Sequence, residues 1–287
     1  MLNLRDDKPE AGLYLVAVPI GAARDITLRA LDLLASADVI AAEDTRAMRR
    51  LMDIHGVALG DRPLLAYHDH NGARVRPRLL AELEAGKSVV YASEAGSPLV
   101  ADPGYALARD AREAGHRVTT APGPSAVIAA LTVGALPTDR FLFAGFLPNA
   151  TGQRKSALAE LSEVPATLVF YESPKRLAAM LRDAAAVLGE GRKASVCREL
   201  TKRFEEVIPG TLSELAAHFN ETTVKGEIVV LVDRGHSPII KEDDLNHLLE
   251  AALESHSLRD AVDAVTGQTG LPRRTVYKAA LKIGRGE

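Results

Sequence analysis

The chain has 287 residues, 47% of them hydrophobic and 25% charged, and its net charge of −3 argues against a uniformly basic nucleic-acid coat. No apolar run reaches the roughly 18 residues that span a bilayer, and the single cysteine, Cys197, excludes an internal disulfide framework. We therefore expect a cytoplasmic protein without a membrane partner, long enough for two medium domains, with Cys197 buried in a structural role.

Apolar runs of strand length alternate with helical patterns along most of the chain. The predicted strands are 13–20, 38–43, 88–93, 117–121, 141–147, 166–172, 194–198 and 227–233. The predicted helices are 25–37, 45–55, 72–85, 104–114, 125–133, 153–163, 174–188 and 211–219. This alternation is typical of βαβ units, so it predicts an α/β fold with a largely parallel sheet covered on both faces. Residues 207–211 indicate a turn and some antiparallel pairing in the second half.

Two breaks divide the chain into three parts. The first break is Pro122-Gly123-Pro124, and the second, at 235–238, follows the last strong strand. The predicted parts are an N-terminal α/β domain over 1–122, a second α/β domain over 123–236, and a helical extension over 237–287.

Within the extension, residues 258–281 predict two short helices around a turn, a pattern like a helix-turn-helix. Arg273, Arg274 and Lys278 lie on the second helix, where they could bind nucleic acid. A small docking module whose basic side chains are merely solvated remains the alternative.

The segment Ser93 to Gly104 joins a predicted buried strand to a helix through Gly, Pro and small residues, which leave backbone groups open to a ligand. We expect Asp102 to cap that helix, with Pro103 at its first position. Four other predicted strand ends carry similar polar breaks, at 18–27, 43–46, 121–126 and 170–174. In a parallel sheet such ends share one edge, so these loops are expected to line a common cleft.

Common nucleotide and metal signatures are missing or misplaced. No Walker P-loop occurs, and the match to the dinucleotide glycine pattern at 189–194 follows a helix instead of a strand. His68-Asp69-His70 has metal-ligand spacing but no accompanying Cys, His or carboxylate set, so we predict a loop and no metal.

Eight spaced motifs resemble, in their order, those of the bacterial small-subunit ribosomal RNA (cytidine-2′-O)-methyltransferase I family, within the tetrapyrrole methylase superfamily. They are Val18 to Gly21 with Asp25 to Thr27, Glu43 to Arg46, Ser93 to Pro98 with Asp102 to Gly104, Pro122 to Ala126, Phe143 to Pro148, Phe170 to Pro174, Arg198 to Lys202, and Gly226-Glu227. The resemblance covers residues 13–233, and the helical tail looks like the extension of that family. Departures from the usual residues occur at Ala22, Gly72, Glu94, Ser97 and Lys175.

The resemblance implies two α/β domains of the tetrapyrrole methylase type, a homodimer, and S-adenosylmethionine bound in the cleft between the domains. Small residues on its loops would let backbone N–H and C=O groups contact the cofactor directly. The residues expected to bind it are Pro19, Ser93, Ala95, Gly96, Ser97, Pro98, Ser125, Ala126, Tyr171 and Gly226.

The resemblance further implies 2′-O-methylation of a cytidine ribose in the decoding region of 16S ribosomal RNA in the small subunit. The enzyme must align the hydroxyl and remove its proton. The candidate bases are Asp25, Asp44, Glu172 and Glu199, with His68 and Lys202 as further possibilities. A structural ion pair with Arg46 is the alternative for Asp44, and a surface pair with Lys202 is the alternative for Glu199.

Arginine side chains on two helices could bind RNA phosphates. Arg46, Arg49 and Arg50 share one helix face, and Arg74 follows the His68 loop, although such arginines can also be merely solvated. Aromatic residues make up only 4% of the chain, which argues against stacking along a single strand. Two other functions stay open: C-methylation of a tetrapyrrole precursor, and a non-enzymatic protein that senses a metabolite and binds nucleic acid.

Overall fold

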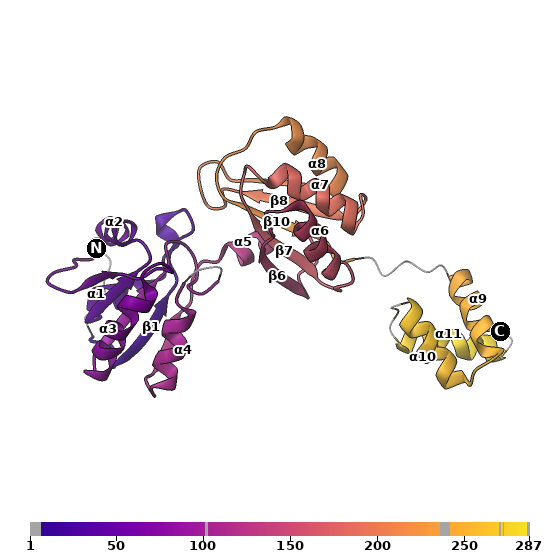
Figure 1. Ribbon diagram of the computed structural model, residues 1–287, viewed down its shortest axis with the longest axis horizontal. Helices are drawn as coiled ribbons and strands as arrows, with labels where there is room; N and C mark the ends of the chain where they lie inside the picture. The colour runs from indigo at the N-terminus through magenta and orange to yellow at the C-terminus, as the bar shows by residue number, and fades with distance from the viewer. Residues whose placement is uncertain (1–6, 101–102, 236–241, 270, 272, 286–287) are drawn as a thin grey trace.

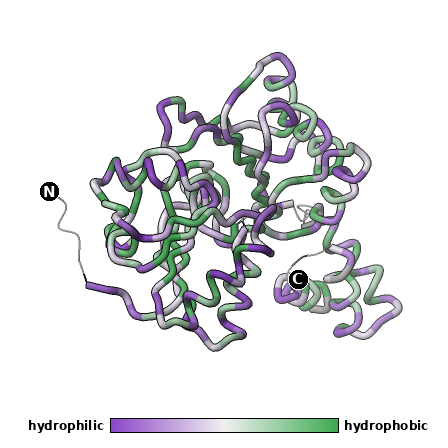
Figure 2. Tube along the Cα trace, turned by 60° about the vertical axis from the view of Figure 1, so that its left-hand side comes forward, coloured by the Kyte–Doolittle hydropathy of each residue, from purple (hydrophilic) through white to green (hydrophobic). Residues whose placement is uncertain are grey.

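The computed structural model describes residues 7–100, 103–235, 242–269, 271 and 273–285. Figure 1 shows two bodies that contain sheets, joined through a helix near the middle of the chain, and a helical body at the C-terminal end. Figure 2 shows hydrophobic segments mostly in the interior of the bodies and hydrophilic segments mostly at their outer turns, as expected where sheets are covered by helices.

The first sheet is entirely parallel, with the strand order β3-β2-β4-β1-β5. Its strands are β1 (Gly12–Val16), β2 (Val39–Ala42), β3 (Leu64–Ala66), β4 (Ser88–Ala92) and β5 (Val118–Ala121). Helices α1 (Leu28–Ser36) and α2 (Thr45–Ile54) pack on one face, and α3 (Gly72–Glu84) and α4 (Tyr105–Glu113) pack on the other. Successive strand residues alternate between the two faces, so Tyr14 and Leu13 belong to different core clusters.

The second sheet is mixed, with the order β6-β7-β10-β8-β9. Its strands are β6 (Phe141–Phe146), β7 (Thr167–Glu172), β8 (Lys193–Arg198), β9 (Glu206–Thr211) and β10 (Ile228–Val232). Only β6 and β7 pair in parallel. Helices α6 (Thr151–Glu160), α7 (Leu177–Leu188) and α8 (Leu212–Glu221) cover one face, and α5 (Ala126–Val133) packs on the other.

The structure confirms the α/β class and corrects three predictions. The largely parallel sheet is confirmed for the first half; in the second half the expected antiparallel pairing is present and dominates, so the sheet there is not largely parallel. Residues 207–211 belong to strand β9 and not to a turn, because β9 is an edge strand, where Pro209 needs no ladder hydrogen bond on its open side. Helix α4 begins at Tyr105 after Gly104, so Pro103 is not its first residue, and Asp102 lies outside the described residues.

The C-terminal body contains α9 (Glu242–Leu253), α10 (Leu258–Thr269) and α11 (Arg273–Arg285). The two helices expected over 258–281 are therefore present, and Leu249 of α9 packs with Val262 and Val276 in one small core. Within the described part of the chain, every helix is too short or too polar to cross a bilayer. The domain boundaries at residues 122 and 236 stay predictions.

Candidate active site

A cleft of about 410 Å³ opens between the two sheets. The loops that follow β1, β4 and β5 form one wall, and the ends of β7, β8 and β10 form the other. Seven of the ten residues expected to bind the cofactor line it: Ala95, Gly96, Ser97, Ser125, Ala126, Tyr171 and Gly226. The predicted common cleft is therefore present, and it lies between loops at one edge of the first sheet and strand ends of the second sheet.

The wall from the first sheet is fixed by backbone hydrogen bonds. Val18 and Gly96 form an isolated antiparallel bridge, with N–H to O distances of 2.9 Å and 3.0 Å. Ser97 Oγ donates to Pro124 O at 3.0 Å, which ties the β4 loop to the β5 loop. Gly96 has φ +72°, a conformation that favours glycine, and keeps its backbone close to the cleft.

Helix α5 begins at this wall. The Ser125 side chain makes no capping hydrogen bond, so the first N–H groups of α5 stay available to polar atoms of a ligand. Tyr171 and Phe146 line the opposite wall with their ring centroids 5.6 Å apart, and Phe146 is 57% exposed. Backbone donors on one side and aromatic rings on the other fit a ligand with both an amino-acid and a nucleoside part.

Cys197 forms part of the cleft lining and is buried, as predicted. Burial raises the pKa of its thiol to about 11, so the sulfur stays protonated near neutral pH. Its environment is therefore that of a packing residue and not of a nucleophile.

Three charged side chains form a cluster at the rim of the cleft, which we call the rim cluster: Glu199, Lys202 and Glu227. Lys202 Nζ lies 3.0 Å from Glu199 Oε1 and 3.1 Å from Glu227 Oε2. Glu227 N–H also donates to Glu199 Oε1 at 3.0 Å. This backbone bond and the Lys202 bond hold the pKa of Glu199 below its usual range.

Lys202 is a cation in this setting. Burial lowers its pKa, but the hydrogen bonds to Glu199 and Glu227 outweigh burial and leave the pKa of the ammonium raised. An amine with a raised pKa is protonated near neutral pH, so Lys202 does not serve as the base.

The loop that carries Lys202 is strained and touches the first sheet's β1 loop. Glu199 and Thr201 both have positive φ, +51° and +63°, at a cost of about 1–3 kcal/mol each. Thr201 Oγ1 accepts a hydrogen bond from Ala22 N at 3.1 Å. A Cβ on Gly21 would lie 2.5 Å from Lys202 Cγ, so the two loops meet closely where the cleft begins.

Glu172 faces away from the cleft, although its backbone helps to line it. Side chains alternate along β7, and Leu168 and Phe170 belong to the core under α6 and α7, which places Glu172 on that face. Arg176 Nε lies 3.2 Å from Glu172 Oε1. Oε2 accepts no hydrogen bond among the described residues, and burial raises the pKa of this carboxyl. Glu172 therefore belongs to a buried network and not to the reacting centre.

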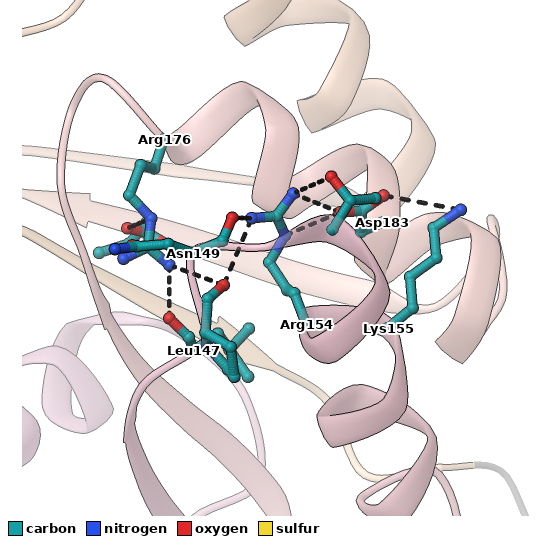
Figure 3. Close-up of polar contacts among 9 residues, drawn as sticks. Leu147, Asn149, Arg154, Lys155, Arg176 and Asp183 are labelled. Atoms are coloured by element: carbon teal, nitrogen blue, oxygen red, sulfur yellow. Dashed lines mark hydrogen bonds and ion pairs between the residues drawn. The ribbon is translucent and has the colours of Figure 1, made fainter.

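The buried network of Glu172, Arg176, Arg154 and Asp183 holds the loop that follows β6 (Figure 3). Arg154 Nη2 lies 2.6 Å from Asp183 Oδ2, and Arg154 Nη1 donates to Asn149 O at 2.9 Å. Arg176 Nη2 donates to the backbone carbonyl of Leu147. Phe146 directly precedes this loop, so the network also helps to hold the aromatic wall of the cleft in place.

The other predicted bases lie elsewhere. Asp25 is exposed in a short 3₁₀ segment, Ala23–Asp25, and does not line the cleft. Asp44 caps α2: its Oδ1 accepts from Arg46 N at 2.7 Å and from Ala47 N at 3.1 Å. The ion pair of Asp44 with Arg46, 3.5 Å long, is also present.

Three expected cofactor residues do not line the cleft. Pro19 and Ser93 line a neighbouring hollow of about 260 Å³ between the β1 loop and α2, and Pro98 lines neither space. Arg50 lines the same hollow. Helix α2, which follows β2, therefore lines this second space, whereas the predicted break at 43–46 lines neither space.

The residues expected to bind RNA are spread over two bodies. Arg46, Arg49 and Arg50 are exposed on α2, and Arg74 is exposed on α3. On α11, Arg274 and Lys278 are exposed, whereas Arg273 Nε forms an ion pair with Asp263 Oδ1 at 2.6 Å. The sequence analysis missed Glu227 as a site residue. Alternation along the last strand would have put Glu227 on the same face as Val229, a residue of the cleft lining.

Comparisons with known proteins define the class. The model of the family Tetrapyrrole (Corrin/Porphyrin) Methylases matches residues 12–216, and the one described as RsmI C-terminal HTH domain matches residues 240–284. Cobalt precorrin-4 methyltransferase, a cobalamin biosynthetic enzyme, shares the fold with a TM-score of 0.57 at 18% identity, over 77% of this chain and 94% of that one. Uroporphyrin-III C-methyltransferase from Thermus thermophilus, solved with S-adenosyl homocysteine, shares the fold with a TM-score of 0.54 at 21% identity. The match covers 77% of this chain and 96% of that one.

Two relatives narrow the class. A ribosomal RNA small subunit methyltransferase I from Mesorhizobium japonicum is 47% identical, over 96% of this chain and 92% of its own length. The protein of that name from Escherichia coli O157:H7 is 42% identical, over 96% of both. The chain therefore belongs to the tetrapyrrole methylase family, in the group of ribosomal RNA small subunit methyltransferase I.

Proposed function

We propose that this chain is an S-adenosylmethionine-dependent methyltransferase that 2′-O-methylates a cytidine in the decoding region of 16S ribosomal RNA. The observation that carries the proposal is the cleft between the two sheets, with backbone donors on one wall and a carboxylate-bearing rim on the other. The names of the relatives support the RNA substrate. Cytoplasmic location follows from that substrate.

The cleft residues fit the cofactor. Ala95, Gly96, Ser97, Ser125 and Ala126 would hold its polar parts through backbone groups, and Tyr171 and Gly226 would bound its nucleoside. When bound, S-adenosylmethionine supplies a methyl group on a sulfonium sulfur, an electrophile with an excellent leaving group. The protein's part is to place the ribose hydroxyl, exclude water and receive a proton.

RNA would be held by exposed cations outside the cleft. Arg46, Arg49 and Arg50 present charge beside the neighbouring hollow, with Arg74 on α3, and Arg274 and Lys278 present charge on the C-terminal body. Cations of this kind position an RNA through its phosphates without reading its sequence. The tail would thus help to dock the small ribosomal subunit.

We also propose a homodimer that buries an apolar surface of the second sheet domain. Ile128 and Val133 of α5 and Phe141 of the edge strand β6 are 52%, 42% and 44% exposed. A contiguous apolar patch marks an interaction site, and a dimer contact through these side chains would form one. Light scattering on the intact chain and on Ile128→Glu tests this: we expect a dimer that the substitution shifts toward monomer.

The function is tested by transfer of radiolabelled methyl groups to small ribosomal subunits from a strain that lacks this methylation. Nuclease digestion should release the label in 2′-O-methylcytidine. Assays on naked 16S RNA and on assembled subunits show which is the substrate. Label in a tetrapyrrole precursor but in no RNA would favour C-methylation instead, and cofactor binding without transfer would favour a sensing role.

A further inference from the structure

Glu227 presents a carboxylate at the rim of the cleft. Its side chain is 73% exposed, and the residue lines the cleft next to Gly226. Strand alternation puts it on the face of Val229 and Leu231, which pack toward α5 and the cleft. Among the acidic lining residues that the structure describes, Glu172 faces the opposite side of the sheet, so Glu227 is the one whose carboxylate a substrate can reach.

Lys202 and Glu199 fix the position of this carboxylate. Lys202 Nζ bonds Glu227 Oε2, and Glu199 Oε1 accepts from both Lys202 Nζ and Glu227 N–H. Glu199 N–H in turn donates to Glu227 O at 3.0 Å. Glu199 is only 18% exposed at its side chain and is engaged in holding its neighbours, so its role is to position and not to react.

The backbone that carries this arrangement is strained, which lowers the stability of the fold. Positive φ at Glu199 and at the β-branched Thr201 is unfavourable, and such strain persists where the surroundings impose it. Gly226, at φ +95°, leaves room for the Glu199 side chain, because a Cβ there would lie 2.3 Å from Glu199 Oε1. Strained backbone of this kind gathers at functional sites, which gives a second, independent reason to place chemistry here.

We propose that Glu227 is the proton acceptor for the ribose hydroxyl of the RNA, with Lys202 and Glu199 as its positioning residues. The inference rests on the proposed function. The hydroxyl oxygen forms a bond to the methyl carbon, while the carbon–sulfur bond breaks and its electron pair stays on sulfur. The hydroxyl proton passes to the Glu227 carboxylate and from there to water.

A carboxylate is a strong enough base to accept this proton. A ribose hydroxyl becomes far more acidic as its oxygen bonds the methyl carbon, so the proton leaves at or after the transition state and needs a well-placed acceptor rather than a strong base. The raised pKa of Lys202 keeps it a cation over the neutral range, and its Nζ holds Glu227 Oε2 in place at 3.1 Å.

The test uses the full chain, small ribosomal subunits and saturating S-adenosylmethionine in single-turnover methyl transfer. Glu227→Gln and Glu227→Ala should slow transfer by roughly 10²–10⁴-fold, the usual contribution of general acid–base catalysis. The affinity for S-adenosylhomocysteine, measured by calorimetry, should stay within about threefold. Added formate, compared with chloride at equal ionic strength, should restore part of the rate of Glu227→Ala, which a structural role would not allow.

Glu206→Gln is the matched control. Glu206 is a half-exposed carboxylate that pairs with Arg198 Nη2 at 3.0 Å and does not line the cleft, so its loss should leave transfer unchanged. Lys202→Met should slow transfer by roughly tenfold because the proton acceptor is misplaced. The affinity for S-adenosylhomocysteine should again stay unchanged.

Transfer by Glu227→Gln within about threefold of the unsubstituted chain would overturn the inference. A loss matched by an equal loss of S-adenosylhomocysteine affinity, or no rescue by formate, would overturn it too and assign Glu227 to binding. An unsubstituted chain that labels no RNA would instead overturn the proposed function on which the inference rests.

Discussion

Two charge clusters of the second sheet domain contain similar side chains in opposite settings. In the buried network, Arg154 of α6, Asp183 of α7 and Glu172 at the end of β7 are each less than 10% exposed. In the rim cluster, Lys202 and Glu227 keep contact with solvent on the other side of the same sheet. The face of the strand on which a carboxylate stands therefore decides whether it holds a loop or meets a substrate.

The largest effect should come from breaking the buried network. Asp183→Ala leaves the Arg154 guanidinium without its carboxylate, and removal of one partner of a buried pair costs about 3–5 kcal/mol. Urea unfolding measures the loss. Asp139→Ala is the control, since its pair with Arg234 is exposed and should change stability little. Equal losses for the two variants would contradict the distinction between the clusters.

Gly226→Ala should be the next largest. It forces a Cβ to within 2.3 Å of Glu199 Oε1 at φ +95°, so we expect about 1–3 kcal/mol of destabilisation together with slower methyl transfer. Gly189→Ala is matched in backbone strain, at φ +106°, but would meet no atom within 4 Å. The excess effect of Gly226→Ala over Gly189→Ala measures the contact with the rim cluster alone.

Thr201→Val sharpens the comparison from the loop side. It keeps the branched side chain but removes the hydroxyl that accepts from Ala22 N, at a cost of about 0.5–1.5 kcal/mol. We expect weaker binding of S-adenosylhomocysteine by calorimetry, because the two walls of the cleft lose a connection. Thr132→Val is the control, since that exposed hydroxyl donates only within its own helix, to Ile128 O.

An effect on stability alone should come from Asp44, which is in neither cluster. Backbone N–H groups of Ala47 and Arg46 lower its pKa, so the ionised form stabilises the fold above the usual aspartate pKa of about 3.9. That contribution is lost as the pH falls through the lowered value. Asp44→Ala should cost about 1 kcal/mol at neutral pH by loss of the cap. A difference in unfolding free energy that persists at the lowest pH would contradict this.

Much of the fold could be predicted from the sequence because it rests on local patterns. Apolar runs such as Val89 to Ala92 predicted the buried strands, and the Gly and Pro residues after them predicted the cleft wall. The three-residue strand β3 was missed because it is too short to give a periodic signal. Strand β9 was missed because Pro209-Gly210 predicts a turn unless the strand lies at an edge.

The site was harder to predict because charge alone does not give orientation. Glu172 and Glu227 both lie at ends of predicted strands. Their side chains point to opposite faces of the sheet because of their positions in the alternation along each strand. The strain of this loop has no sequence signal, although the loop itself, Arg198 to Lys202, is one of the eight motifs. Thr201 Oγ1 accepts a hydrogen bond from Ala22 N of the β1 loop, and Thr201 N–H donates to Glu205 Oε2 four residues later. The residues beside Thr201 in the sequence reveal neither contact.

The ion pair between Arg273 and Asp263 has a consequence for the salt dependence of RNA binding. An arginine already neutralised by a carboxylate brings little uncompensated charge to a phosphate, so it displaces few counterions. Arg274 has no ion pair among the residues that the structure describes. In plots of log affinity against log salt concentration, Arg274→Ala should reduce the slope by about 0.7–0.9, and Arg273→Ala should leave it nearly unchanged.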